Sequence, residues 1–420
     1  MKLSRRSGLA LASLSIVALG LSACAGAAEE AEEAAVDSGD TSEESTTEET
    51  VEYDPFGHID FSSYDAASLD PAVNERGFLL LTEWHELFPE DEAVMREVLD
   101  SLSGEPRPVG VEVTEPLELV MMFPSLEISD AFARLQLSIE GHLDELGIPY
   151  NVTEFFTNAG EHGVQAGQID KVLASVEQYD YVIIGPSEYL VQKDNIGRLA
   201  EAIPTLVMNV VNPFPDTVGT AQMPLTHVSF DHSEGAAKLC AWVLENEGTE
   251  GTFALQRYLP GLIDSGRSDE FATCLQEAGW ELVDEYPGDG DQEKSFTGSN
   301  AMLSANPDID MIHNGSTAGA LGTLAALAAQ NKGDEVLTNG WGGGQDELDS
   351  MLEGELDFTL FRVNDDWGAG VAEVIRLHLE GQPVPVVLSP SMKVLDKSMT
   401  QEMIDAETDY AFRYSGVLER

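Results

Sequence analysis

The chain has 420 residues, 43% of them hydrophobic, which is enough for two packed domains rather than one. Its 76 acidic and 21 basic residues give a formal net charge of −55, which argues against nucleic acids and anionic membrane surfaces as partners. Twelve of the acids lie between Glu29 and Asp54, but the rest of the chain is strongly acidic as well. This charge indicates a solvated anionic surface and leaves the ligand open.

The first 24 residues have a basic start, an apolar run from Leu9 to Leu21 and a cysteine at the end, MKLSRRSGLALASLSIVALGLSAC. This pattern resembles the bacterial lipoprotein signal, in which the cysteine is lipidated and becomes the first residue. We therefore predict export, lipidation of Cys24, and a lipid anchor as the only membrane contact, at the outer face of the cell membrane or in the periplasm. An ordinary signal peptide or an uncleaved anchor is the alternative, and the pair Arg5-Arg6 leaves the export route open.

Residues 25–54 are rich in Ala, Glu, Ser and Thr and have almost no large apolar side chains. Such a segment cannot bury enough surface to fold, and its charges extend it. We expect a disordered acidic tether.

From Leu117 onwards, short apolar runs alternate with segments of helical period. We expect strands over 117–123, 150–156, 179–185, 204–210, 226–230, 252–257, 280–286, 309–313 and 335–340. We expect helices over 129–146, 234–246, 268–279, 294–304 and 317–330. The alternation predicts an α/β fold with parallel sheets covered on both faces, and the restart near residue 226 predicts two successive doubly wound units.

Ligands of such sheets bind beyond the carboxyl ends of the strands. The residues at these positions are Ser125–Ser129, Gly185–Ser187, Asn209, Arg257, Arg267, Ser316, Thr317, Trp341 and Arg362. Together they suit a pocket for a small polar ligand, with one apolar wall and fixed donors. The alternatives are a helix cap for Ser129, a turn amide for Asn209, a core ring for Trp341, and surface ion pairs for Arg267 and Arg362.

No motif indicates an enzyme, a metal site or a cofactor. The segment GSTAG at 315–319 has Thr317 at its centre and is not a nucleophile elbow, and GWGGGQD lacks the Lys-Ser/Thr of a phosphate loop. The eight histidines are scattered, and no CxxC or HExxH spacing occurs. After export, Cys240 and Cys274 either form one disulfide or remain two buried thiols.

Several segments resemble known receptors. VSFDHSEGAAKL at 228–239 resembles the domain-crossing segment of type I periplasmic binding proteins. A closer resemblance to the LuxP-type autoinducer-2 receptors lies in EWHELFPEDEAV, NGWGGGQDELD, DFTLFRVNDDWGAGVAEVIR, GQPVP and AFRYS. It covers about Gly77 to the C-terminus and is densest over 338–386.

The resemblance implies two α/β lobes joined by three hinge crossings. The lobes would comprise 115–230 plus 364–387 and 231–363 plus 388–420, after a helical extension at 55–114. The implied ligand is the quorum signal autoinducer-2 as its furanosyl borate diester, and the implied partner is a membrane sensor kinase. The alternative is a sugar receptor that serves an ABC permease.

The family's site positions fall on Glu127, Ser129, Phe132, Asn209, Arg267, Ser316, Thr317, Trp341 and Arg362. The resemblance places Arg267 and Arg362 against the borate, and a guanidinium offers a planar fork of donors to such an anion. Sugar-binding relatives carry Gly-Phe-Asp where this chain has Gly340-Trp341-Gly342, so a carboxylate that would repel an anion is missing.

The chain departs from the family's pattern at four positions. The family's glutamine, tryptophan, threonine and aspartate are here Glu127, Phe132, Gly185 and Ala318. These departures affect the identity of the ligand rather than the fold, because a carboxylate at position 127 is unfavourable beside an anion.

Overall fold

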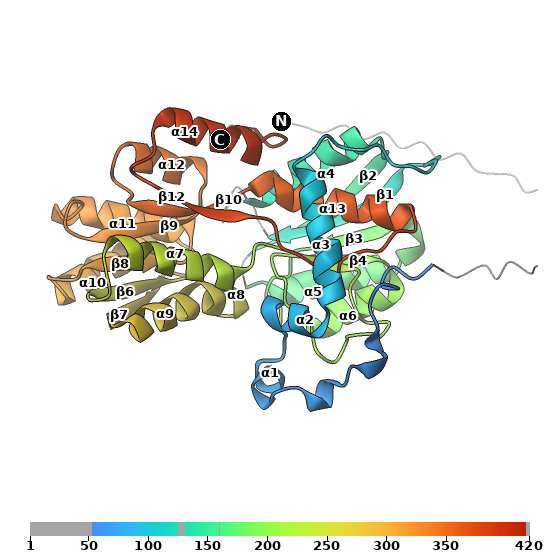
Figure 1. The fold of residues 1–420 in the computed structure, drawn as a ribbon, viewed down its shortest axis with the longest axis horizontal. Coiled ribbons are helices and arrows are strands. Elements are labelled where there is room, and N and C mark those ends of the chain that lie inside the picture. Colours follow the sequence, from blue (N-terminus) through green and yellow to red (C-terminus); the bar gives the residue numbers. More distant parts are fainter. Residues whose placement is uncertain (1–52, 125–130, 159, 417–420) are drawn as a thin grey trace, which may run out of the picture. The chain divides into compact units, whose positions relative to one another are not determined.

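A computed structural model describes residues 53–124, 131–158 and 160–416 (Figure 1). Cys24, Glu127 and Ser129 lie outside the described residues, as do the signal segment and nearly all of the predicted tether. Among the described residues, no helix combines the length and apolar character that crossing a membrane requires.

The first sheet has six parallel strands in the order β11-β5-β4-β3-β1-β2. Their bounds are β1 Leu117–Pro124, β2 Tyr150–Thr157, β3 Tyr181–Ile184, β4 Thr205–Met208, β5 Thr226–Val228 and β11 Val387–Leu388. The helices are α4 Ala131–Leu146, α5 His162–Leu173, α6 Lys193–Ala202 and α13 Asn364–Leu379. β3 and β4 are buried along their whole length, as expected of parallel strands with helices on both faces.

The second sheet has the order β12-β10-β9-β8-β6-β7. Its strands are β6 Thr252–Arg257, β7 Glu281–Pro287, β8 Met311–Asn314, β9 Leu337–Gly342, β10 Phe358–Arg362 and β12 Met392–Asp396. Its helices are α7 His232–Asn246, α9 Glu270–Ala278, α10 Gln292–Ala305, α11 Thr317–Gln330, α12 Gln345–Leu352 and α14 Gln401–Ala411. Cys240 of α7 and Cys274 of α9 form a disulfide. The predicted α/β class with two doubly wound sheets is confirmed, although the edge strand β12 is antiparallel to β10.

Several helix boundaries differ from the expected ones, and two of these differences have clear local causes. α7 begins at His232 rather than residue 234, because the Asp231 side chain accepts the backbone N–H of Ser233 and caps the helix there. α9 begins at Glu270 rather than 268, because the preceding residues Ser265–Asp269 form a π-helical turn. Turns of this kind are often found at functional sites.

The chain passes between the two sheets three times in Figure 1. It crosses between β5 and α7, returns between β10 and α13, and crosses again between β11 and β12. The lobe bounds and the role of these passages as hinges stay predictions.

Three helices precede the first sheet, α1 Pro71–Arg76, α2 Leu81–Leu87 and α3 Pro89–Leu102. The fully buried carboxylate of Asp91 in α3 accepts hydrogen bonds from the Trp84 indole at 2.7 Å and from the backbone N–H of Val386 at 2.9 Å. A single side chain of this extension therefore holds the segment that leads into β11.

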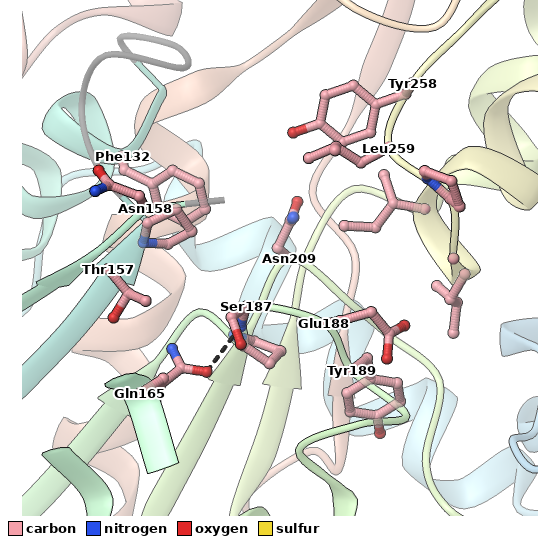
Figure 2. A pocket seen from close by; sticks show the side chains of 16 residues that line it. Phe132, Thr157, Asn158, Gln165, Ser187, Glu188, Tyr189, Asn209, Tyr258 and Leu259 are labelled. Atoms are coloured by element: carbon pink, nitrogen blue, oxygen red, sulfur yellow. Dashed lines mark hydrogen bonds between the residues drawn. The ribbon is translucent and has the colours of Figure 1, made fainter. Parts of the chain in front are cut away.

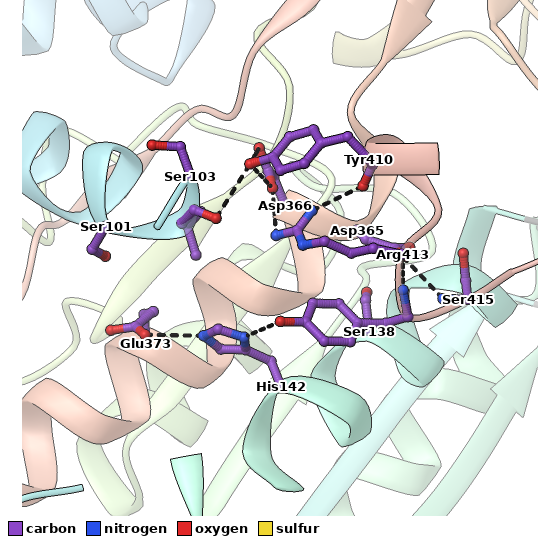
Figure 3. A network of polar contacts seen from close by, with 12 residues as sticks. Ser101, Ser103, Ser138, His142, Asp365, Asp366, Glu373, Tyr410, Arg413 and Ser415 are labelled. Carbon is purple, nitrogen blue, oxygen red and sulfur yellow. Dashed lines mark hydrogen bonds and ion pairs between the residues drawn. The ribbon is translucent and has the colours of Figure 1, made fainter. Parts of the chain in front are cut away.

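The last described residues, 410–416, connect the two sheets in a second way, and we call them the C-terminal clasp (Figure 3). The clasp begins in the last turn of α14, which packs against the second sheet. The Asp365 carboxylate of α13, which packs against α4, accepts the backbone N–H groups of Tyr414 and Ser415 at 2.6 and 2.9 Å. The Tyr414 hydroxyl lies 2.7 Å from Nδ1 of His142 in α4. The clasp thus attaches an element of the second sheet to helices of the first.

Candidate functional site

A pocket lies where the carboxyl ends of strands from both sheets meet. It has about 500 Å³ of atom-free space, part of it open to solvent. Its lining consists of Ala131, Phe132, Asn209, Tyr258, Arg267, Gly290, Ser316, Thr317, Trp341, Arg362 and Trp367, and we call it the arginine pocket. Seven of the nine predicted ligand-binding residues are among these, and the other two, Glu127 and Ser129, lie outside the described residues.

The glycine run at the end of β9 makes room for side chains. The buried Glu347 carboxylate accepts the backbone N–H of Trp341 at 3.2 Å, and a Cβ at Gly340 would lie 2.4 Å from its Oε2. A Cβ at Gly342 (φ +132°) would lie 2.8 Å from Nη2 of Arg362. The glycine run therefore positions Trp341 and leaves room for the Arg362 guanidinium. This packing accounts for the glycines, and a bound phosphate is not needed to explain them.

Trp341 is only 2% exposed, and its indole N–H makes no hydrogen bond to another described residue. Trp341 is thus both a packed core ring and a wall of the pocket, so the expected role and its alternative both apply to this side chain.

Arg267 projects from the π-helical turn and is 7% exposed. Its Nη1 donates to the Gly315 carbonyl at 2.9 Å, and its guanidinium carbon lies 5.2 and 5.1 Å from the ring centres of Tyr258 and Trp341. Burial, together with the charge of nearby Arg362, lowers the pKa of Arg267 to about 9, so the group remains cationic at neutral pH. No described carboxylate forms an ion pair with it, unlike a surface arginine in an acidic protein.

His232 connects this arginine to the first sheet. Its Nδ1 accepts a hydrogen bond from Nε of Arg267 at 3.4 Å, and its Nε2 donates to the backbone carbonyl of Asn209 at 3.2 Å. Burial, and secondarily the charge of Arg267, holds the pKa of His232 well below its usual range. The neutral ring satisfies both contacts with one N–H and one lone pair.

Asn209 follows β4 and has a left-handed backbone, φ 68°. Its backbone N–H donates to Val228 at 3.2 Å, and its side-chain amide makes no hydrogen bond to another described residue. Asparagine tolerates this conformation better than most residues, and the conformation leaves the amide available to a ligand.

The remaining predicted residues have structural contacts as well. The Ser316 hydroxyl accepts the backbone N–H of Gly319 at 3.0 Å and caps α11, and the Thr317 hydroxyl donates to the Trp341 carbonyl at 3.2 Å. Arg362 lies at the end of β10, with its guanidinium carbon 5.5 Å from the ring centre of Phe230.

The departures at Phe132 and Gly185 belong together. A Cβ at Gly185 would lie 3.0 Å from Cε1 of Phe132, so glycine at this position makes space for the ring. Phe132 also packs against Trp367, with ring centres 5.6 Å apart. The pair therefore shapes one wall of the pocket.

Residue-type reasoning missed Tyr258, Trp367 and His232. The polar residue at the end of β6 is Arg257, but this side chain pairs with Asp264, Asp269 and Glu285, and it is the next residue, Tyr258, that lines the pocket. The rule that site residues follow strands was therefore useful here, but it selected Arg257, the last residue of β6, instead of Tyr258. Among the described residues, no group of three or more His, Cys, Asp or Glu side chains could hold a metal ion.

Comparisons with known proteins agree with this architecture. The family model described as periplasmic binding protein domain matches residues 119–383, more than half of the chain. Over 157 residues the chain is 27% identical to the ribose import binding protein RbsB of Salmonella typhimurium, a match that covers 37% of this chain and 50% of that protein. The chain thus spans about half the length of the curated relatives it matches.

Two solved structures illustrate the shared fold. A solute-binding protein of an ABC transporter from Agrobacterium vitis, with bound α-D-tagatopyranose, has a TM-score of 0.62 and 17% identity, and the match covers 70% of this chain and 98% of that one. The fructose-binding periplasmic domain of a hybrid two-component system has a TM-score of 0.60 and 16% identity, with 70% and 94% covered. At these identities the likeness concerns the fold alone. The family match and the two-sheet architecture lead to one conclusion: the chain belongs to the periplasmic binding protein family, whose members are solute receptors and not enzymes.

Proposed function

We propose that this protein is an extracytoplasmic receptor for a small polyhydroxylated ring, a sugar, and that it delivers this ligand to an ABC importer. The observation that carries the proposal is the lining of the arginine pocket, in which the aromatic rings of Phe132 and Trp341 occur beside the planar polar groups of Asn209 and Arg267. A sugar presents apolar C–H faces and a rim of hydroxyls. Aromatic walls suit the faces, and fixed planar donors suit the rim.

The relatives support the same ligand class. The curated relatives include ribose import proteins, and the solved structures of this fold include proteins with bound D-allose, myo-inositol and α-D-tagatopyranose. These names favour a sugar over the more specific autoinducer-2 assignment.

The test is a thermal-shift and calorimetric screen of the purified protein against D-ribose, D-allose, D-tagatose, D-fructose and myo-inositol. A bound ligand should stabilise the native state by mass action and so raise the melting temperature. At a ligand concentration of 100 Kd the free energy of unfolding should increase by about 2.7 kcal/mol. At least one compound should bind with a 1:1 stoichiometry. A flat response to all five would contradict the proposal.

The borate diester of autoinducer-2 is the second candidate, and one observation of the pocket favours it: the guanidiniums of both Arg267 and Arg362 line it. The resemblance noted in the sequence adds that Gly342 stands where sugar-binding relatives carry a carboxylate. An anionic furanose adduct would gain from both features. Titration with autoinducer-2, with and without borate, separates the candidates. Binding of the anionic borate diester should require added borate, whereas binding of a neutral sugar should not. This ligand would connect the receptor to a membrane sensor kinase, whereas a sugar would connect it to a permease.

The same proposal includes the anchor and the hinges. Lipidation of Cys24 would hold the receptor at the outer face of the membrane on a tether of residues 25–54, and the three crossings would let two lobes close over the ligand. Incorporation of labelled palmitate into the wild type and not into Cys24→Ser tests the anchor.

A further inference from the structure

A second hollow adjoins the arginine pocket and shares Phe132, Asn209 and Tyr258 with it (Figure 2). It has about 660 Å³ of atom-free space, part of it open to solvent. The segment after β6, residues 259–263, supplies Leu259, Pro260, Leu262 and Ile263 to its wall, and Tyr189 contributes from the turn after β3. We call it the apolar pocket.

Most polar groups of the apolar pocket are already used within the protein. Oε1 of Gln165 accepts the backbone N–H of Ser187 at 2.8 Å, a contact drawn in Figure 2, and its Nε2 donates to the Gly185 carbonyl at 2.9 Å. The Tyr189 hydroxyl donates to the Asn212 carbonyl at 2.7 Å. Glu188 accepts the backbone N–H of Val191 at 2.7 Å. What this hollow offers a ligand is therefore mainly apolar surface.

The border between the two pockets is different. The amide of Asn209 and the hydroxyl of Tyr258 make no hydrogen bond to another described residue, and both residues line both hollows. Both backbones are held in place, that of Tyr258 by the Asp264 carboxylate at 2.8 Å and that of Asn209 by Val228 and His232. Because the backbones are fixed and the Asn209 amide and Tyr258 hydroxyl are available, both groups suit hydrogen bonds to a ligand that extends from one pocket into the other.

We propose that the ligand has two parts: a polyhydroxylated ring in the arginine pocket and an apolar or aromatic substituent in the apolar pocket. Asn209 and Tyr258 hydrogen-bond the atoms that join them. The chemical class is a glycoside with an apolar aglycone, and the inference rests on the proposed function. The physical reason is that a bare monosaccharide would leave the surface formed by residues 259–263 in contact with water, whereas an aglycone would remove it from water.

The test compares the methyl and phenyl glycosides of D-ribose and D-allose, in both anomers, with the parent sugars by isothermal titration calorimetry. One phenyl glycoside should bind about tenfold or more tightly than the methyl glycoside of the same sugar and anomer, because the ring buries additional apolar surface. If a parent sugar binds and no phenyl glycoside exceeds its methyl counterpart, the two-part ligand is wrong while the sugar-receptor proposal stands. If none of the five compounds of the screen and none of the glycosides binds, both proposals are wrong.

Variants separate the two pockets. Leu259 lines only the apolar pocket, so Leu259→Ser should reduce the phenyl advantage several-fold and leave binding of the methyl glycoside unchanged. Leu87→Ser is the matched control, since that leucine is exposed and lines neither pocket. Tyr258→Phe should weaken methyl and phenyl glycosides alike. An equal loss for both glycosides in Leu259→Ser, with the melting temperature retained, would overturn the assignment.

Discussion

Nδ1 of His232 accepts the hydrogen bond of Nε of Arg267, at 3.4 Å, within a ring that also donates to Asn209. The contact orients the pocket arginine from the first crossing of the chain. It requires a neutral imidazole, because a protonated ring would present a donor to a donor and a charge to a like charge.

This requirement predicts a pH-dependent difference between the wild type and His232→Gln. Because the pKa of His232 is lowered in the folded protein, its stabilising contribution is complete above the ordinary value of about 6.5 and is lost as the pH falls below it. The glutamine variant has no such loss. The wild type should therefore have the higher melting temperature at pH 7.5, and its excess over the variant should become smaller as the pH falls to 5. A gap that stays constant or widens would contradict the neutral, buried ring.

Removal of either pocket guanidinium should weaken ligand binding. Arg267→Ala and Arg362→Ala should each cost about 1.5–3 kcal/mol of binding free energy, the range for a hydrogen bond to a charged group. Calorimetry with the ligand found in the sugar screen measures the loss. Arg198→Ala is the control, because that arginine pairs with Asp170 and lines neither pocket. Binding by the double alanine variant at wild-type strength would exclude both arginines from the site.

Gly342→Ala should both destabilise the protein and weaken binding. The positive φ alone costs about 1–2 kcal/mol for a residue with a side chain, and the new Cβ would also lie 2.8 Å from Nη2 of Arg362. Gly354→Ala controls for the positive φ, since a Cβ there meets no atom within 4 Å. Urea unfolding and calorimetry should show a larger loss at 342, with reduced affinity only at 342. Equal effects at both positions would mean that Gly342 serves the turn and not Arg362.

The C-terminal clasp should contribute measurable stability. Tyr414→Phe removes the hydroxyl that donates to Glu145 at 2.6 Å and contacts Nδ1 of His142 at 2.7 Å, at a cost of about 1–2 kcal/mol. Tyr53→Phe is the matched control, because that exposed hydroxyl makes one hydrogen bond, to the Gln382 carbonyl. The free energy of unfolding from urea titration should fall more for position 414. No difference between the two variants would show that the clasp hydroxyl adds nothing.

The fold and the place of the site were predictable because both follow from periodicity. Alternating strands and helices imply parallel sheets, and the carboxyl ends of parallel strands meet at one edge. This is why Asn209, Trp341 and Arg362, which lie far apart in the chain, line one pocket.

The rest depended on geometry that residue types do not encode. The direction of β12 is set by its pairing with β10, and an apolar run reads the same in either direction. The π-helical turn changes which side chains around Arg267 face the pocket, and no motif marks it. His232 looks like an ordinary first residue of a helix until Asn209 and Arg267 are found on either side of it.

The carboxylate of Asp91 has a practical consequence for where this receptor begins. The family model starts at residue 119, but Trp84, Phe88 and Leu79 belong to the same apolar cluster as side chains of β1 and α13. Trimming the gene at the start of the matched stretch would remove these side chains from the cluster and leave the Val386 amide without its acceptor. The leading helices are thus part of the receptor's folded body, and a shortened version should be expected to precipitate.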